Sequence, residues 1–347
     1  MTTPDTPSRT PRPTLPRTMR AVVQRGYGDA DVLDVAEIDV PSPRKGEVLL
    51  HVEAAGVDRG TWHLMTGTPK LVRLALGWKQ PRGTYVAGRD VAGTVVAVGE
   101  GVTRFALGDR VFGSARGSLA EHATAVEDKL GHQPAGTDAA GCAVLAISGL
   151  TALHALDAAR VGAGDRVLVT GASGGVGSYV VQLAAARGAV VTGVCSAAKA
   201  DAVRRWGATT VLDYRTTDPT AGDDRYDAVI DIAGGTALPR LRRVLTPRGT
   251  IVFVGAETGG GWTGGMGGTM SKALWMLFAR QRFVMLMAKE KAPADLERLA
   301  QAVTEGSLVP PVHAVRPLEQ VRAAMAELID GTAVGKLAVS VDATGRG

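Results

Sequence analysis

The sequence of 347 residues contains few cysteines and no long apolar run. Its two cysteines, Cys142 and Cys195, are too few for a disulfide framework or a cysteine-rich zinc lobe, which favours a reducing cytoplasm. No apolar stretch of about 18 residues occurs, and the most apolar segment, 273–287, is interrupted by Arg280 and Arg282, so no membrane-spanning helix is expected. Residues 1–17 lack the apolar core of a secretion signal and are rich in Thr and Pro, which predicts a disordered tail.

Charge of one sign is not concentrated anywhere in the chain. The 39 basic and 34 acidic side chains leave a net charge of +5, and aromatic residues make up only 4% of the sequence. No run of Lys and Arg is interleaved with aromatic residues, so a nucleic-acid-binding surface is not expected. The modest positive charge fits a solvated surface and an anionic ligand.

Glycine, by contrast, is abundant, and one glycine-rich turn stands between an apolar run at 167–169 and a helical apolar pattern that ends before Gly188. The turn contains Gly171, Ser173, Gly174, Gly175 and Gly177. Strand, glycine turn and helix together bind the pyrophosphate of a dinucleotide, because glycines let the backbone approach and the helix N-terminus offers free N–H groups. A second apolar run at 189–194 completes a βαβ unit, so a dinucleotide cofactor is the first hypothesis. The alternative in so glycine-rich a chain is a tight turn without a ligand.

The length favours two domains of about 150 residues each. Short runs at 21–23, 48–52, 91–98 and 110–112, separated by turn residues, predict an irregular β-rich domain. Later runs predict a doubly wound parallel sheet with strands at 167–170, 190–194, 210–212, 228–232, 250–254 and 283–287. The runs 309–315 and 336–341 are expected to return to the first domain. We therefore expect a tail at 1–17, the first domain at 18–140 and 289–347, and the cofactor domain at 141–288.

The chain resembles the medium-chain dehydrogenase/reductase superfamily, in particular its zinc-free quinone oxidoreductase-like branch. The motifs that carry this resemblance span 19–341 and read GEVLLHVEAAGVD (46–58), GRDVAGTVVAVGEGV (88–102), GDRVFG (108–113), SGLTALHAL (148–156), VLVTGASGGVG (167–177), VLDYR (211–215) and GKLAVSV (335–341). The resemblance implies an α/β fold in which a GroES-like β-rich catalytic domain is wrapped around a Rossmann domain, with the active site between them. It also implies a homodimer, which is common in the family.

The positions of the catalytic zinc ligands in zinc-dependent relatives carry other residues here. Asp58, Arg89 and Asp90 stand where those relatives have Cys and His-Glu, and Val144 and Leu145 stand near the last ligand position. A catalytic zinc needs about three ligands of the Cys, His or carboxylate type. Since Arg89 is a permanent cation that would repel the metal, a site without zinc is expected.

Several residues near this position are candidates for the catalytic site. Asp58 stands where relatives often have an Asn that touches the nicotinamide side of the pocket, and we expect Arg89 and Asp90 to form an internal ion pair that replaces the metal. His63 is the best titratable candidate, with an ordinary loop histidine as the equal alternative. Tyr85 is a candidate hydrogen-bond donor or a packing residue.

The residues after the second strand of the cofactor domain favour NADPH. An NAD site would place a carboxylate about 20 residues after the glycine turn, where this chain has Cys195 and Ser196. The resemblance assigns the 2′-phosphate to Ser196, Lys199 and Tyr214. The alternative for Lys199 is a solvated lysine in the first turn of the next helix.

Further cofactor contacts follow from the resemblance, with simple strand-end packing as the alternative for each. The full set of expected cofactor residues is Thr151, Ser173, Gly174, Gly175, Val176, Ser196, Lys199, Tyr214, Phe253, Val254 and Gly255. Residues 231–234 are expected to line the same crevice at the carboxyl ends of the strands.

The absence of zinc restricts the acceptor. Without a metal, an oxygen that becomes negative must be stabilised by hydrogen-bond donors, and an activated alkene or quinone spreads this charge better than a plain ketone. We therefore expect NADPH-dependent reduction of a quinone or an α,β-unsaturated carbonyl, with the proton from solvent. The alternatives are a zinc-independent alcohol or aldehyde oxidoreductase and a non-catalytic NADPH-binding protein.

Overall fold

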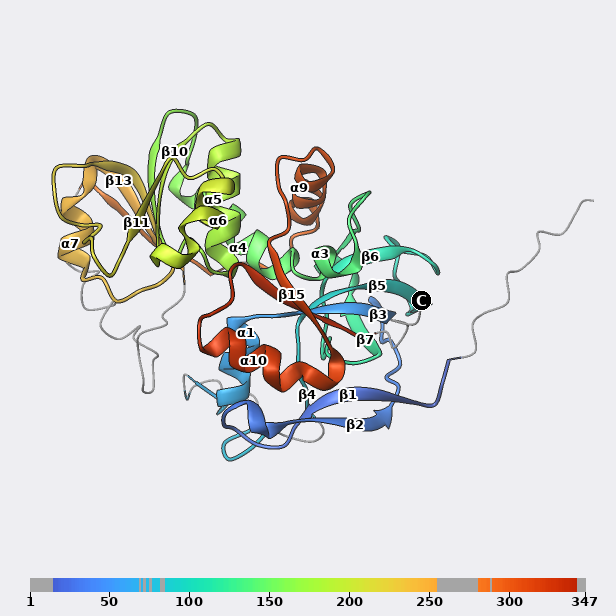
Figure 1. Ribbon diagram of the computed structural model, residues 1–347. Coiled ribbons are helices and arrows are strands. Elements are labelled where there is room, and N and C mark those ends of the chain that lie inside the picture. Colours follow the sequence, from blue (N-terminus) through green and yellow to red (C-terminus); the bar gives the residue numbers. More distant parts are fainter. Residues whose placement is uncertain are drawn as a thin grey trace, which may run out of the picture.

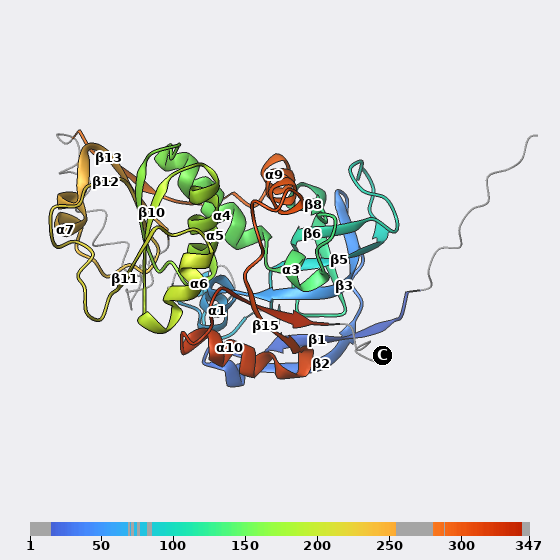
Figure 2. The same cartoon turned by 45° about the horizontal axis from the view of Figure 1, so that its top comes forward.

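The computed structural model describes residues 15–68, 70, 73–74, 77–81, 85–254, 280–287 and 289–341. Two groups of elements lie side by side (Figure 1). One group is built on a parallel sheet with helices packed against it, and the other on antiparallel strands. Figure 2 shows the same separation after a turn of the molecule, with α9 (Pro293–Thr304) between the two groups.

The parallel sheet holds six strands among the described residues, in the order β11-β10-β9-β12-β13-β14. These strands are β9 (Arg166–Thr170), β10 (Val190–Cys195), β11 (Thr210–Asp213), β12 (Tyr226–Asp231), β13 (Leu245–Phe253) and β14 (Arg282–Met285). Every pairing is parallel, and the order is that of a Rossmann sheet, so the predicted doubly wound sheet is confirmed. The associated helices are α4 (Ala146–Ala159), α5 (Gly175–Ala186), α6 (Ala200–Arg205) and α7 (Leu238–Arg243).

The β-rich part contains a small sheet of β2-β1-β4 and a larger one with the order β15-β16-β3-β5-β6-β8, in which β7 also pairs with β3. The strands are β1 (Thr18–Gln24), β2 (Leu33–Asp39), β3 (Glu47–Val57), β4 (Tyr85–Val86), β5 (Asp90–Val98), β6 (Arg110–Ser114), β7 (His122–Val126), β8 (Leu130–His132), β15 (Val312–Pro317) and β16 (Lys336–Ser340). Because β16 pairs antiparallel with β3, the C-terminal strands lie in the same sheet as the N-terminal ones, as expected. The strands β2, β4, β7 and β8 were not predicted.

The main core continues from one part of the molecule into the other. Gly56 of β3 allows α3 (Ala139–Ala143) to approach closely, since a Cβ there would lie 2.5 Å from the carbonyl oxygen of Ala143. Cys142 is fully buried in the same core cluster as Leu156 of α4 and Val169 of β9. The large sheet of the β-rich part and the Rossmann sheet are thus joined by continuous apolar packing.

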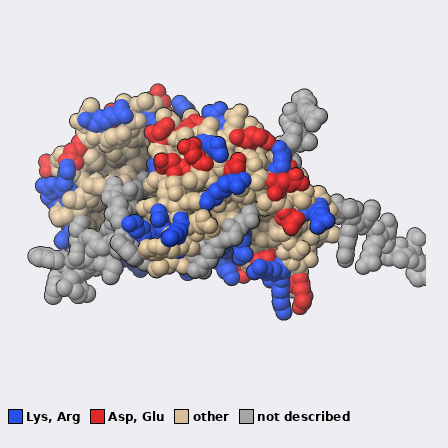
Figure 3. Space-filling model, turned by 90° about the horizontal axis from the view of Figure 1, so that it is seen from below, with Lys and Arg blue, Asp and Glu red and all other residues tan. Residues whose placement is uncertain are grey.

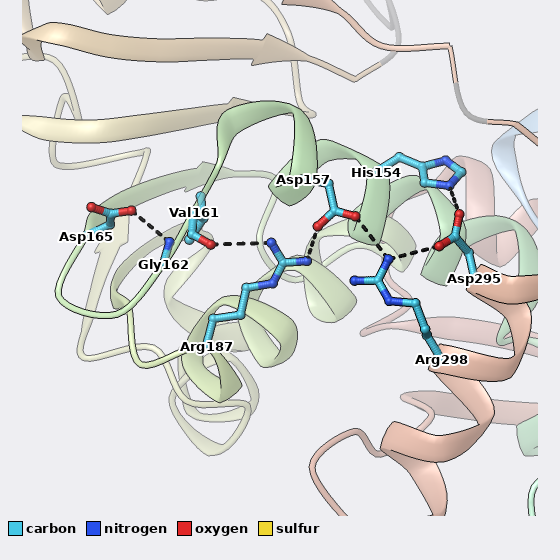
Figure 4. A network of polar contacts seen from close by, with 8 residues as sticks. All are labelled: His154, Asp157, Val161, Gly162, Asp165, Arg187, Asp295 and Arg298. Carbon is cyan, nitrogen blue, oxygen red and sulfur yellow. Dashed lines mark hydrogen bonds and ion pairs between the residues drawn. The ribbon is translucent and has the colours of Figure 1, made fainter.

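A polar network fixes α9 to the Rossmann part (Figure 4). Asp157 of α4 accepts hydrogen bonds from Arg187 at 2.6 Å and from Arg298 at 3.2 Å, and Asp295 accepts from Arg298 and from His154, each at 2.9 Å. Burial raises the pKa of Asp295, but the hydrogen bonds from His154 and Arg298 outweigh it and leave the pKa lowered. The network therefore holds the start of α9, and with it the segment at 289–290, in a defined position.

No helix among the described residues is long and apolar enough to cross a membrane. On the face shown in Figure 3, basic and acidic side chains are intermingled. That face carries no extended patch of one charge.

Candidate functional site

The glycine turn after β9 has the geometry of a phosphate-binding turn. Gly171 adopts a φ of +67°, which favours glycine, and a Cβ on Gly177 would lie 2.1 Å from the carbonyl oxygen of Gly171. Gly174 is the N-cap of α5, and a Cβ there would meet only that same oxygen, at 3.4 Å. The first-turn N–H groups of α5, including those of Gly175 and Val176, have no intrahelical partner. Open space beside free N–H groups fits the pyrophosphate of a dinucleotide.

The carboxyl ends of the neighbouring strands lie at the same edge as this turn. Thr170 pairs in register with Val194 and Asp231, and Asp231 pairs with Phe253. Thr170 donates its hydroxyl hydrogen to Asp231 at 2.6 Å, and burial raises the pKa of Asp231. This link between β9 and β12 was not foreseen in the sequence, because the two side chains are 61 positions apart.

The residues expected at the 2′-phosphate share this edge but differ in exposure. Ser196 follows β10 and is 8% exposed, whereas Tyr214 follows β11 and is 58% exposed. Lys199 donates hydrogen bonds to the carbonyl oxygens of Gly331 at 2.5 Å and Ala333 at 2.7 Å, and burial lowers its pKa. Lys199 therefore contacts the loop before β16 in addition to lying near the expected phosphate position.

Two further expected cofactor residues, Phe253 and Val254, lie at the same edge. Phe253 ends β13, and Val254 follows it with its N–H donating to the carbonyl oxygen of Asp231 at 2.9 Å. Thr151 lies within α4 and donates its hydroxyl hydrogen to the carbonyl oxygen of Ile147 at 2.7 Å. Gly255 lies outside the described residues.

Asp58 and His63 are placed by α1 (Arg59–Thr66), which begins directly after β3. Asp58 is the N-cap and accepts a hydrogen bond from the Thr61 N–H at 2.7 Å through Oδ1. Its other oxygen, Oδ2, is buried without a hydrogen-bond partner among the described residues. His63 is bonded through Nδ1 to the carbonyl oxygen of Thr68 at 2.9 Å, which is a local helix-end contact.

The expected ion pair between Arg89 and Asp90 is wrong, because each side chain pairs with a residue from the C-terminal part of the chain. Arg89 forms an ion pair with Glu290, while Asp90 pairs with Lys336 at 3.1 Å. Asp90 and Lys336 are 0% and 2% exposed, and Asp90 also accepts from the Ile147 N–H at 2.8 Å. Burial raises the pKa of Asp90, and the ammonium of Lys336 opposes this rise. Arg89 lies just before β5 and Asp90 is its first residue, and the two neighbours in sequence have separate partners.

The Asp90–Lys336 pair lies between the two parts of the molecule and next to the glycine turn. The Lys336 side chain passes Gly175, where a Cβ would lie 2.9 Å from its Cδ, and the adjacent Gly335 N–H donates to the Ser173 carbonyl oxygen at 2.9 Å. Within the part of the chain that the structure describes, no three His, Cys, Asp or Glu side chains come together as metal ligands.

Comparison with known proteins agrees with this architecture. The chain matches the family described as "Alcohol dehydrogenase GroES-like domain" over residues 44–203, "Zinc-binding dehydrogenase" over 206–339 and "NAD dependent epimerase/dehydratase family" over 167–244. A chloroplast envelope quinone oxidoreductase homolog of Arabidopsis thaliana is 34% identical over 336 residues, which cover 92% of this chain and 98% of the relative.

Solved structures show the same fold over nearly the whole chain. The quinone oxidoreductase of Coxiella burnetii is 27% identical with a TM-score of 0.83, covering 94% of this chain and 100% of its own. A mycobacterial protein solved in complex with NADPH is 26% identical with a TM-score of 0.80, covering 93% of this chain and 100% of its own.

Fold and site together define a two-domain oxidoreductase that uses a nicotinamide cofactor. The chain belongs to the medium-chain dehydrogenase/reductase superfamily, among the quinone oxidoreductase homologues. The α/β fold class that the sequence predicts, a GroES-like domain with a Rossmann domain, is confirmed.

Proposed function

We propose that the protein reduces a quinone or an α,β-unsaturated carbonyl by hydride transfer from NADPH, without zinc. The observation that carries this proposal is the use of the former ligand positions in ion pairs: Arg89 with Glu290 and Asp90 with Lys336. A guanidinium at a ligand position repels a metal ion, and a carboxylate already paired with a buried ammonium is a poor ligand. Acceptors that delocalise the incoming charge need the least electrophilic assistance.

Different residues of the chain bind the cofactor and position α1. The turn at Ser173–Val176 supplies N–H groups for the pyrophosphate, and bound NADPH supplies the hydride. Asp58 caps the start of α1 through Oδ1, and its buried Oδ2 has no hydrogen-bond partner among the described residues. A cytoplasmic location and a homodimer belong to the same proposal. It also includes His63 and Arg89 as catalytic-site residues and Thr151 and Gly255 as cofactor-binding residues.

NADPH preference is expected to depend on Lys199. Replacing Lys199 with Ala removes a cation from the 3-10 turn that follows β10, so the dissociation constant for NADPH is expected to rise about tenfold and that for NADH less than twofold. Titration of intrinsic fluorescence with each cofactor measures both constants. Since Lys199 also holds the loop at 331–333, an equal loss for both cofactors would assign it to that loop and remove it from the 2′-phosphate site.

The acceptor class is tested by the rate of NADPH oxidation with a quinone, an enone and a saturated aldehyde at equal concentrations. Turnover of the first two alone is the expected result. Turnover of the aldehyde at a comparable rate would favour the alcohol or aldehyde oxidoreductase. Tight NADPH binding without turnover of any acceptor would favour the non-catalytic NADPH-binding protein.

A further inference from the structure

A cavity lies in the β-rich part of the molecule, beside Arg89. The cavity has a volume of about 390 Å³. We call it the arginine pocket, and the lining residues that matter here are Tyr85, Arg89, Ser114, Arg116, Lys129 and Glu290. Tyr85 belongs to β4, Arg89 directly precedes β5, Ser114 ends β6 and Arg116 follows it, Lys129 ends the 3-10 turn before β8, and Glu290 precedes α9. The charged side chains lining the cavity are three cations, Arg89, Arg116 and Lys129, and two carboxylates, Glu47 and Glu290.

The polar groups of the arginine pocket are only partly satisfied. Glu290 forms ion pairs with Arg89 and, at 2.6 Å, with Lys129. Arg116 is exposed, and neither its guanidinium nor the Tyr85 hydroxyl has a hydrogen-bond or ion-pair partner among the described residues. Burial lowers the pKa of Lys129, and the nearby charges of Arg89, Lys291 and Arg116 lower it further. An oxyanion would meet a free guanidinium and a free hydroxyl.

The arginine pocket adjoins the residues assigned to the acceptor. A Cβ built on Gly60 would lie 3.3 Å from Arg89 Nη1 and 3.2 Å from Asp58 Oδ1, so Arg89 borders both the pocket and the N-cap of α1. Asp90, which follows Arg89 in the chain, is bonded to Lys336 next to the glycine turn. Arg89 and Asp90 thus connect the arginine pocket with the neighbourhood of the glycine turn.

We infer that the arginine pocket binds an oxyanion of the acceptor, a carboxylate or a phosphate, and that the preferred substrates are enones or quinones that carry such a group. The identity of the substrate in this inference rests on the proposed reduction. The oxyanion-binding site itself does not depend on it. Arg116 and Tyr85 supply the first contacts, and Arg89 contributes its charge from the cofactor side.

Binding is tested separately from turnover. The probe is 4-oxopentanoate, the saturated product of reducing 4-oxopent-2-enoate, titrated calorimetrically into the protein saturated with NADPH. The expected result is saturable binding that Arg116→Gln weakens about tenfold, the loss of one charge-assisted hydrogen bond. Arg248→Gln, which removes an exposed arginine of β13 that does not line the arginine pocket, is the control for net charge and is expected to leave the affinity unchanged. Equal affinities in all three proteins, or no saturable binding, would overturn the inference.

Kinetics then test the substrate class. With 4-oxopent-2-enoate and its methyl ester as a matched pair, the acid is expected to have about tenfold the kcat/KM of the ester in the wild type, and Arg116→Gln is expected to reduce this ratio to near one. An acid-to-ester ratio that Arg116→Gln leaves unchanged would overturn the inference while the proposed reduction stands. Arg116-dependent binding of 4-oxopentanoate without turnover of either compound would contradict the reduction and leave the oxyanion site standing.

Discussion

Replacing Lys336 with Met is expected to lower the free energy of unfolding by about 3–5 kcal/mol, because it leaves the carboxylate of Asp90 buried without its counter-charge. Methionine keeps most of the aliphatic stem that packs under Gly175, so the change is confined to the lost ammonium. The midpoint and slope of urea unfolding, followed by tryptophan fluorescence, give the difference.

A double variant separates the lost pair from a general packing defect. In Lys336→Met/Asp90→Asn the asparagine oxygen still accepts the Ile147 N–H, and no buried charge is left, so most of the lost stability is expected to return. If the double variant is as unstable as the single one, the stability difference comes from packing around Lys336 and not from the ion pair.

Two alanine substitutions at the glycine turn are expected to weaken cofactor binding alike but to differ in their effect on stability. A Cβ on Gly177 would lie 2.1 Å from the Gly171 carbonyl oxygen, so Gly177→Ala must displace the backbone of the turn and should destabilise the fold by about 1–3 kcal/mol as well as abolish cofactor binding. Gly174 has a φ of −84° and open space around it, so Gly174→Ala should fold with nearly wild-type stability.

Gly174→Ala is nevertheless expected to raise the dissociation constant for NADPH at least tenfold, because its methyl group occupies the space in which we place the pyrophosphate. Fluorescence titration and urea unfolding of both variants measure the two properties independently. Wild-type NADPH affinity in Gly174→Ala would show that the pyrophosphate lies elsewhere.

The sequence predicts the Rossmann part more completely than the β-rich part. Buried parallel strands are continuous apolar runs, as at 167–169, and the glycine turn marks the first of them. In β2, by contrast, only Leu33 is buried, and its charged residues conceal the strand pattern. Strand β8 is only three residues long, too short for a periodic signal.

The sequence predicts those parts of the site that depend on local residues. It does not predict the contacts between residues that are distant in the chain. The glycine turn is visible because its glycines serve the backbone of one short segment. The partners of Arg89 and Asp90, Glu290 and Lys336, follow more than 200 residues later, and nothing in the local pattern distinguishes them from a pair between neighbours. The arginine pocket likewise assembles from segments that lie far apart in the sequence.

The most direct test of the account is the rate of NADPH oxidation with a quinone or enone after exhaustive chelation, with the zinc content of the same sample measured. We predict an unchanged rate with less than about one zinc per ten protein chains, since the ligand positions are used in ion pairs. A rate that falls in proportion to the metal removed, and that added zinc restores, would contradict the account.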